Sequence, residues 1–148
     1  MSYYLIILIV LVAMSPLISA IPSRRKRKIA DLRQAAAMSG LYVKLRDIPR
    51  GERLGERAAF YGRKRLREHK AAVHEVLLYR EDDCWSTALG RWPEARLNKL
   101  TALPEGVSML EETAAGIGVF WGEEGETADV LVLNTVLKGL LEGEDLSP

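Results

Sequence analysis

The sequence is poor in the residues that build disulfide and zinc sites. Its 148 residues include one cysteine, Cys84, and two histidines, His69 and His74. A single thiol excludes an intramolecular disulfide and fits a reducing compartment. The spacing of the two histidines matches neither the helical zinc pattern nor a zinc cluster with Cys84. We therefore expect no disulfide framework and no metal site.

Sequence motifs for catalysis are also missing. The chain contains no P-loop, no serine nucleophile elbow and no protein-kinase signature. Gly116, Gly118 and Gly122 differ in spacing from a dinucleotide-binding loop, and the acidic Glu123 and Glu124 follow where a phosphate would need backbone donors. These absences predict a protein that is not an enzyme and holds no cofactor.

Charge is absent from the first 23 residues, where an apolar run stands instead. Between Tyr3 and Ile21 only Ser15, Pro16 and Ser19 are not apolar. As a helix this run would span about 28 Å, close to the hydrocarbon thickness of a bilayer. We predict a transmembrane helix over residues 3–21, followed by a basic juxtamembrane helix over residues 22–40.

A basic cluster directly after the apolar run decides between three interpretations of this segment. A cleaved signal peptide would carry positive charge before the run, and dense charge after it resists translocation. A nucleic-acid-binding cluster would need no apolar neighbour. The positive-inside rule instead predicts an uncleaved single-pass anchor, with the N-terminus outside and the rest cytoplasmic. The residues expected to contact anionic headgroups are Arg24, Arg25, Lys26, Arg27 and Lys28.

The charges of the chain are divided between its two halves. Residues 1–80 hold 17 basic and 6 acidic side chains, whereas residues 81–148 hold 4 and 14. Folding that brings the halves together would pair these charges internally. A second basic surface next to Phe60 and Tyr61 is predicted, which is typical of a solvated face but also of lipid or single-stranded nucleic-acid binding. Its members are Arg63, Lys64, Arg65, Arg67 and Lys70.

Residues 41–148 have the pattern of a small cytoplasmic α+β domain with a mostly antiparallel sheet and a C-terminal helix. The acidic turn at residues 81–83 separates two strands, and residues 47–57 form a polar loop. The expected strands are 41–46, 74–80, 84–87, 107–111 and 117–121, and the expected helices are a short one after Pro93 and a longer one over 127–141. Trp85, Trp92 and Trp121 are candidates both for the core and for a partner contact.

The segments "IPSRRKRKIADL" and "LYVKLR" resemble the YajC-type accessory subunits of the bacterial preprotein translocase. The resemblance covers the first third of the chain and implies a bacterial inner-membrane address. It also implies a small β-containing cytoplasmic domain that is accessory to a membrane complex. Separately from this resemblance, an anchor followed by a small domain without a catalytic constellation predicts a protein-interaction domain that binds a protein partner of unknown identity. The alternative is a membrane-tethered module that binds nucleic acid or anionic lipid.

Overall fold

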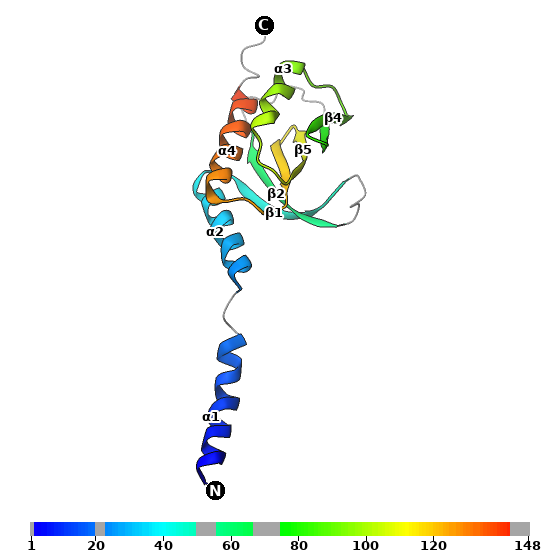
Figure 1. Ribbon diagram of the computed structural model, residues 1–148. Helices are drawn as coiled ribbons and strands as arrows, with labels where there is room; N and C mark the ends of the chain where they lie inside the picture. Colours follow the sequence, from blue (N-terminus) through cyan, green and yellow to red (C-terminus); the bar gives the residue numbers. More distant parts are fainter. Residues whose placement is uncertain (1, 20–22, 50–55, 67–74, 143–148) are drawn as a thin grey trace. The chain divides into compact units, whose positions relative to one another are not determined.

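The structure, a computed structural model, describes residues 2–19, 23–49, 56–66 and 75–142 (Figure 1). The chain divides into two compact units, Met1–Ala30 and Asp31–Pro148. The second unit contains a β-sheet and the helices that cover one of its faces. Its fold is α+β, with an antiparallel sheet and a C-terminal helix as the sequence pattern predicts.

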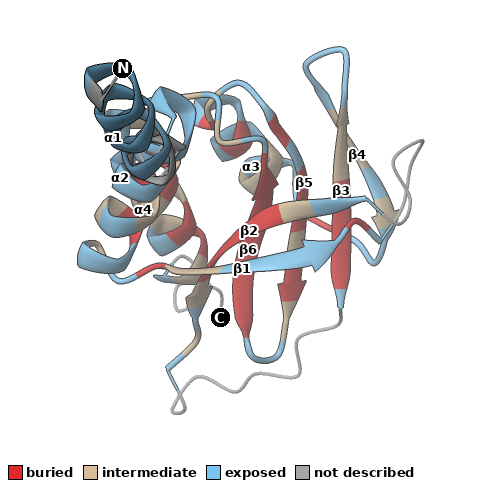
Figure 2. Ribbon diagram, turned by 90° about the horizontal axis from the view of Figure 1, so that it is seen from below, coloured by how far each residue is buried: buried red, intermediate tan, exposed pale blue. Residues whose placement is uncertain are grey.

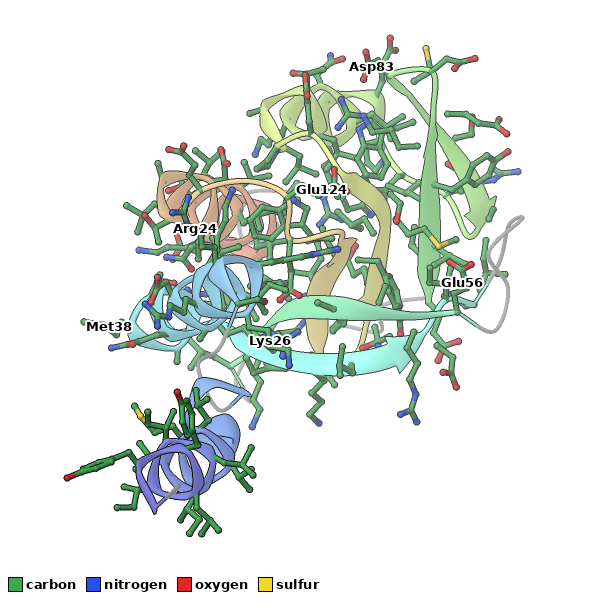
Figure 3. The ribbon with its side chains drawn as sticks, turned by 60° about the horizontal axis from the view of Figure 1, so that its bottom comes forward. Arg24, Lys26, Met38, Glu56, Asp83 and Glu124 are labelled. Atoms are coloured by element: carbon green, nitrogen blue, oxygen red, sulfur yellow. The ribbon has the colours of Figure 1, made fainter. Side chains whose placement is uncertain are left out.

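The first helix, α1, covers Ser2–Ser19, and the prediction of a transmembrane helix over residues 3–21 is wrong. Within the described residues, no helix combines the length and the apolar character that crossing a membrane requires. The single-pass placement in a bacterial inner membrane, with an outer N-terminus and a cytoplasmic domain, depended on that helix and is wrong as well. Side chains 3–14 are exposed and radiate around the helix (Figure 3).

The second helix, α2, covers Arg24–Met38 and joins the core through its C-terminal half. Ser23 caps its start, because its hydroxyl oxygen accepts a hydrogen bond from the backbone N–H three residues later, at 3.3 Å. Leu32 and Ala36 lie one turn apart on the same face and are both buried. Gly40 follows with a φ of +86°, a left-handed conformation that commonly ends a helix.

Six strands form one antiparallel sheet within the described residues, in the order β1-β2-β6-β5-β3-β4. Figure 2 shows β5 and β6 buried in the middle of the sheet and β1 exposed at one edge. The β3–β4 and β5–β6 pairs are hairpins, as predicted, and the positive φ angles of Asp82 and Asp83 form the tight turn between β3 and β4. The bounds are β1 Tyr42–Asp47, β2 Arg57–Lys64, β3 Val76–Glu81, β4 Cys84–Leu89, β5 Val107–Thr113 and β6 Gly116–Trp121.

The main core lies between one face of the sheet and the remaining helices. The short α3 (Glu94–Leu97) and the 3-10 helix η2 (Asn98–Ala102) precede β5, and α4 (Thr127–Glu142) ends the described chain. Helix α4 has an apolar stripe with a helical period, which buries it against the sheet. The members of that stripe are Val130, Leu133, Leu137 and Leu140.

The opposite face of the sheet carries a second apolar cluster that contains no helix residue. Phe60 of β2 and Phe120 of β6 meet there edge to face, with ring centroids 5.1 Å apart. Gly118 leaves the space that Phe60 occupies, because a Cβ at this glycine would lie 2.6 Å from a ring carbon. The guanidinium of Arg46, on β1, stacks 4.6 Å from the centre of the Phe60 ring. The cluster is therefore closed by a basic side chain of the edge strand.

Candidate functional site

A cleft of about 400 Å³ opens where the end of β2 meets the start of β1 and the last turn of α4. Its lining brings together four basic side chains, one acidic side chain and several apolar ones. The basic and acidic members are Arg63, Lys64, Arg65, Lys138 and Glu142, and the apolar members include Leu41, Leu66 and Leu141. Such a lining combines positive charge with apolar surface, which suits a ligand that carries carboxylates beside apolar groups.

Arg63 is held in the cleft by the C-terminal helix. Its Nη1 donates a hydrogen bond of 2.7 Å to the side-chain oxygen of Asn134 on α4. This partner is a neutral amide, so the contact orients the guanidinium without neutralising its charge.

Lys64 follows Arg63 in β2 and is exposed. Successive strand residues point to opposite faces, so Lys64 extends on the face of Phe60 and Arg63 on the helix-covered face. The two cations therefore reach the cleft from both sides of the sheet end. Lys138 adds a third positive charge from α4, 3.6 Å from the carboxylate of Glu142.

Arg65 lines the cleft and is bound to a buried carboxylate. Its Nη2 lies 2.9 Å from Oε1 of Glu112, whose side chain is 1% exposed. The same carboxylate accepts hydrogen bonds from both terminal nitrogens of Arg96, each at 3.1 Å, and from the indole N–H of Trp92 at 2.7 Å. The guanidinium of Arg96 also stacks on the Trp92 ring at 4.3 Å. This network fixes the backbone at the end of β2 and so positions Arg63 and Lys64.

A second buried carboxylate ties α2 to the end of β6. Glu123 accepts hydrogen bonds from Nε and Nη2 of Arg33 at 2.8 and 2.9 Å, and from the Tyr61 hydroxyl at 2.8 Å. Burial raises the pKa of the Tyr61 phenol, and its hydrogen bond to the Glu123 carboxylate raises it further. The hydrogen bonds to Glu123 raise the pKa of Arg33 above its ordinary value. The contact between Arg33 and Glu123 therefore attaches α2, from Asp31 onward, to the rest of the second unit.

Strand β1 extends from the cleft along the edge of the sheet. Within the described residues it pairs only with β2, so one of its two edges has no neighbouring strand. Lys44, Leu45, Arg46 and Asp47 are exposed. The ammonium of Lys44 lies 5.6 Å from the centre of the Tyr42 ring, on the face of the second apolar cluster. The basic surface therefore continues from the cleft onto the edge strand.

The predicted basic residues are divided by the structure. Arg63, Lys64 and Arg65 come together in the cleft, whereas Arg67 and Lys70 lie outside the described residues. The cluster Arg24–Lys28 forms the start of α2 and is exposed. Its contact with anionic headgroups stays a prediction.

The three tryptophans occupy different depths. Trp121 is 1% exposed and donates its indole N–H to the carbonyl of Glu105 at 3.0 Å, and Trp92 is 9% exposed and bound to Glu112. Trp85 is half-buried and packs against the main core. A partner contact by these residues stays a prediction, and their packing accounts for them as core residues.

In the part of the chain that the structure describes, no group of three or more His, Cys, Asp or Glu side chains could hold a metal ion. Cys84 is exposed at the start of β4. His69 and His74 lie outside the described residues. In the cleft, burial raises the pKa of the Tyr42 phenol, which disfavours its action as a general base.

Comparison of the chain with protein-family models, with curated proteins and with solved structures found no match. The resemblance of the N-terminal third to YajC-type subunits therefore stays a prediction. The function has to be inferred from the cleft and the edge strand themselves.

Proposed function

We propose that the unit Asp31–Pro148 is a non-catalytic module that binds a protein partner through an acidic segment of that partner. One observation carries the proposal: Arg63, Lys64 and Lys138, from two separate elements, line one cleft together with leucine side chains. Carboxylates of a partner would pair with the basic groups, and its apolar side chains would contact the leucines.

The burial of the neighbouring aromatic rings favours a protein partner over single-stranded nucleic acid. Binding of single strands relies on aromatic faces on which bases stack. Phe60 and Tyr61, which stand beside the basic cluster in the sequence, are 3% and 0% exposed. Arg46 stacks on the Phe60 ring from the open side. The cleft therefore offers charge and aliphatic surface, but these two rings are occupied.

The proposal is tested with a dye-labelled peptide of eight residues in which Glu and Val alternate, titrated with the full-length chain and followed by fluorescence anisotropy. Lys64→Glu replaces an exposed cleft cation by an acid, so the dissociation constant should rise by about five- to tenfold. Arg91→Glu is the matched control, because Arg91 is also exposed but does not line the cleft. This variant should bind the peptide within about twofold of the unmodified chain.

Two outcomes would contradict the proposal. One is an equal loss of affinity in Lys64→Glu and Arg91→Glu, which would mean that only overall charge matters. The other is displacement of the labelled peptide by single-stranded RNA, or by vesicles rich in anionic lipid, under conditions in which an excess of the unlabelled peptide does not displace it. That result would assign the cleft to nucleic acid or to a lipid surface.

A further inference from the structure

We infer that the partner's acidic segment binds as an additional β-strand along the edge of β1 that has no neighbouring strand among the described residues, next to the basic cleft. The inference rests on the proposed function and adds the backbone geometry and the side-chain pattern of the segment. In an antiparallel pair every second residue of a strand directs its N–H and C=O away from its neighbour. Half of the backbone groups of Tyr42–Asp47 are therefore directed to the outer side of the sheet, where an extended chain can pair with them.

The two edges of the sheet differ in how well they can accept such a strand. The pairing of β1 with β2 runs without interruption from Tyr42 to Asp47. The other edge strand, β4, is distorted, because its register with β3 shifts between Leu77 and Leu78. It is also preceded by the acidic turn at Asp82 and Asp83, which repels a negatively charged segment. The edge of β1 is regular and basic, so charge complementarity favours it.

The side chains of β1 specify the pattern of the segment that fits. Val43 packs on the face of the main core, and Leu45 has the same orientation and is 57% exposed. Lys44 and Arg46 lie on the opposite face, with their charged groups over the rings of Tyr42 and Phe60. An added strand places its alternate side chains beside these two sets. Acidic residues should therefore stand at every second position, with apolar residues between them.

A second copy of this chain is a poorer occupant of the same edge. Two β1 strands paired with each other would place the Lys44 and Arg46 side chains of both copies on one ribbon, and like charges across a strand pair are unfavourable. Basic side chains on an edge strand are a common means of preventing such self-association. Lys64 extends on the same face as Lys44, so it adds to the repulsion between copies and to the attraction for an acidic strand.

The experiment compares three versions of the alternating Glu–Val peptide with the full-length chain. In an extended peptide the N–H groups of the Glu residues point to one edge and those of the Val residues to the other. N-methylation of all Glu residues, or of all Val residues, therefore blocks one edge while keeping every side chain. We expect one methylated peptide to bind within about twofold of the unmodified peptide and the other to bind at least about tenfold more weakly.

The outcomes separate this inference from the proposed function. Equal affinities of the two methylated peptides, whether both are retained or both are lost, would overturn strand addition. If Lys64→Glu still weakens the unmodified peptide in that case, recognition of acidic segments stands without the strand. If an alternating Lys–Val peptide binds as tightly as the Glu–Val peptide, the proposed function itself fails, and the inference fails with it.

Discussion

Glu112 lies on the helix-covered face of β5, fully buried, and its carboxylate receives Arg65, Arg96 and Trp92. Transfer of a carboxylate into such a site is costly unless each lone pair finds a donor, and here the donors come from the residue that follows β2, from α3 and from the segment before α3. The residue therefore connects three parts of the chain. It also connects the core to the cleft, because Arg65 belongs to both.

At this scale, Glu112→Gln should destabilise the protein strongly. The amide keeps the shape but removes the charge that two guanidinium groups face, and breaking a buried pair in this way costs about 3 to 5 kcal/mol. Urea denaturation measures the change in the free energy of unfolding. Glu81→Gln is the control, because Glu81 is exposed at the end of β3 and should change stability by less than about 0.5 kcal/mol. Equal midpoints for Glu112→Gln and the unmodified chain would show that the network does not stabilise the fold.

The hairpins and the C-terminal helix are the elements that local sequence predicts well. The alternating pattern around residues 107–121 and the helical stripe of residues 127–141 depend on neighbours in the chain, so they can be read without tertiary information. Strand β2 was not predicted, since a basic run hides its alternation. Arg63 and Arg65 turn inward only because Asn134 and Glu112, far along the chain, provide acceptors.

At the scale of elements, two glycine-to-alanine substitutions form a matched pair: one lies where Phe60 approaches β6 closely, and the other lies in α4. Gly118→Ala places a methyl group against the Phe60 ring and 2.8 Å from the backbone oxygen of Tyr61, so it should cost about 1 to 3 kcal/mol. Gly139→Ala, inside α4, meets no atom within 4 Å and should stabilise the helix by about 0.5 to 1 kcal/mol.

Thermal unfolding compares the two variants directly. Replacement of glycine by alanine should lower the midpoint of thermal unfolding when it is made at Gly118 and raise the midpoint when it is made at Gly139. A Gly118→Ala variant that unfolds at the same temperature as the unmodified chain would contradict the packing of Phe60 on this glycine.

At the scale of the whole molecule, basic side chains from the first half of the sequence form ion pairs with acidic side chains from the second half. Arg33, Arg46 and Arg65, from the basic half, pair with Glu123, Glu111 and Glu112 of the acidic half. Internal pairing was the simpler expectation from the sequence, and these ion pairs confirm it for the described residues. Among the basic groups of the cleft and the edge strand, Lys44 and Lys64 are exposed and are not part of these three ion pairs.

The strand order could not be predicted from the sequence, because it depends on contacts between residues that are distant in the chain. Strand β2 pairs with β1 and with β6, so a segment near residue 60 lies beside one near residue 120. Packing of α4 near β2, which are also distant in the chain, brings Lys138 and Lys64 to the lining of one cleft. The apolar run at the start of the chain gave a wrong prediction: its composition predicts a membrane span, but among the described residues no helix is long and apolar enough to cross a membrane.

Mapping the peptide-binding surface of the protein by nuclear magnetic resonance tests directly whether an acidic segment binds at the edge of β1 and in the cleft. Backbone amide signals of the full-length chain are recorded while the alternating Glu–Val peptide is added. The largest shifts should occur in residues 41–47 of β1 and in residues 63–66 at the cleft, whereas the signals of β4 at the opposite edge should be unchanged. Largest shifts in Cys84–Leu89, or shifts spread evenly over all exposed lysines and arginines, would contradict it.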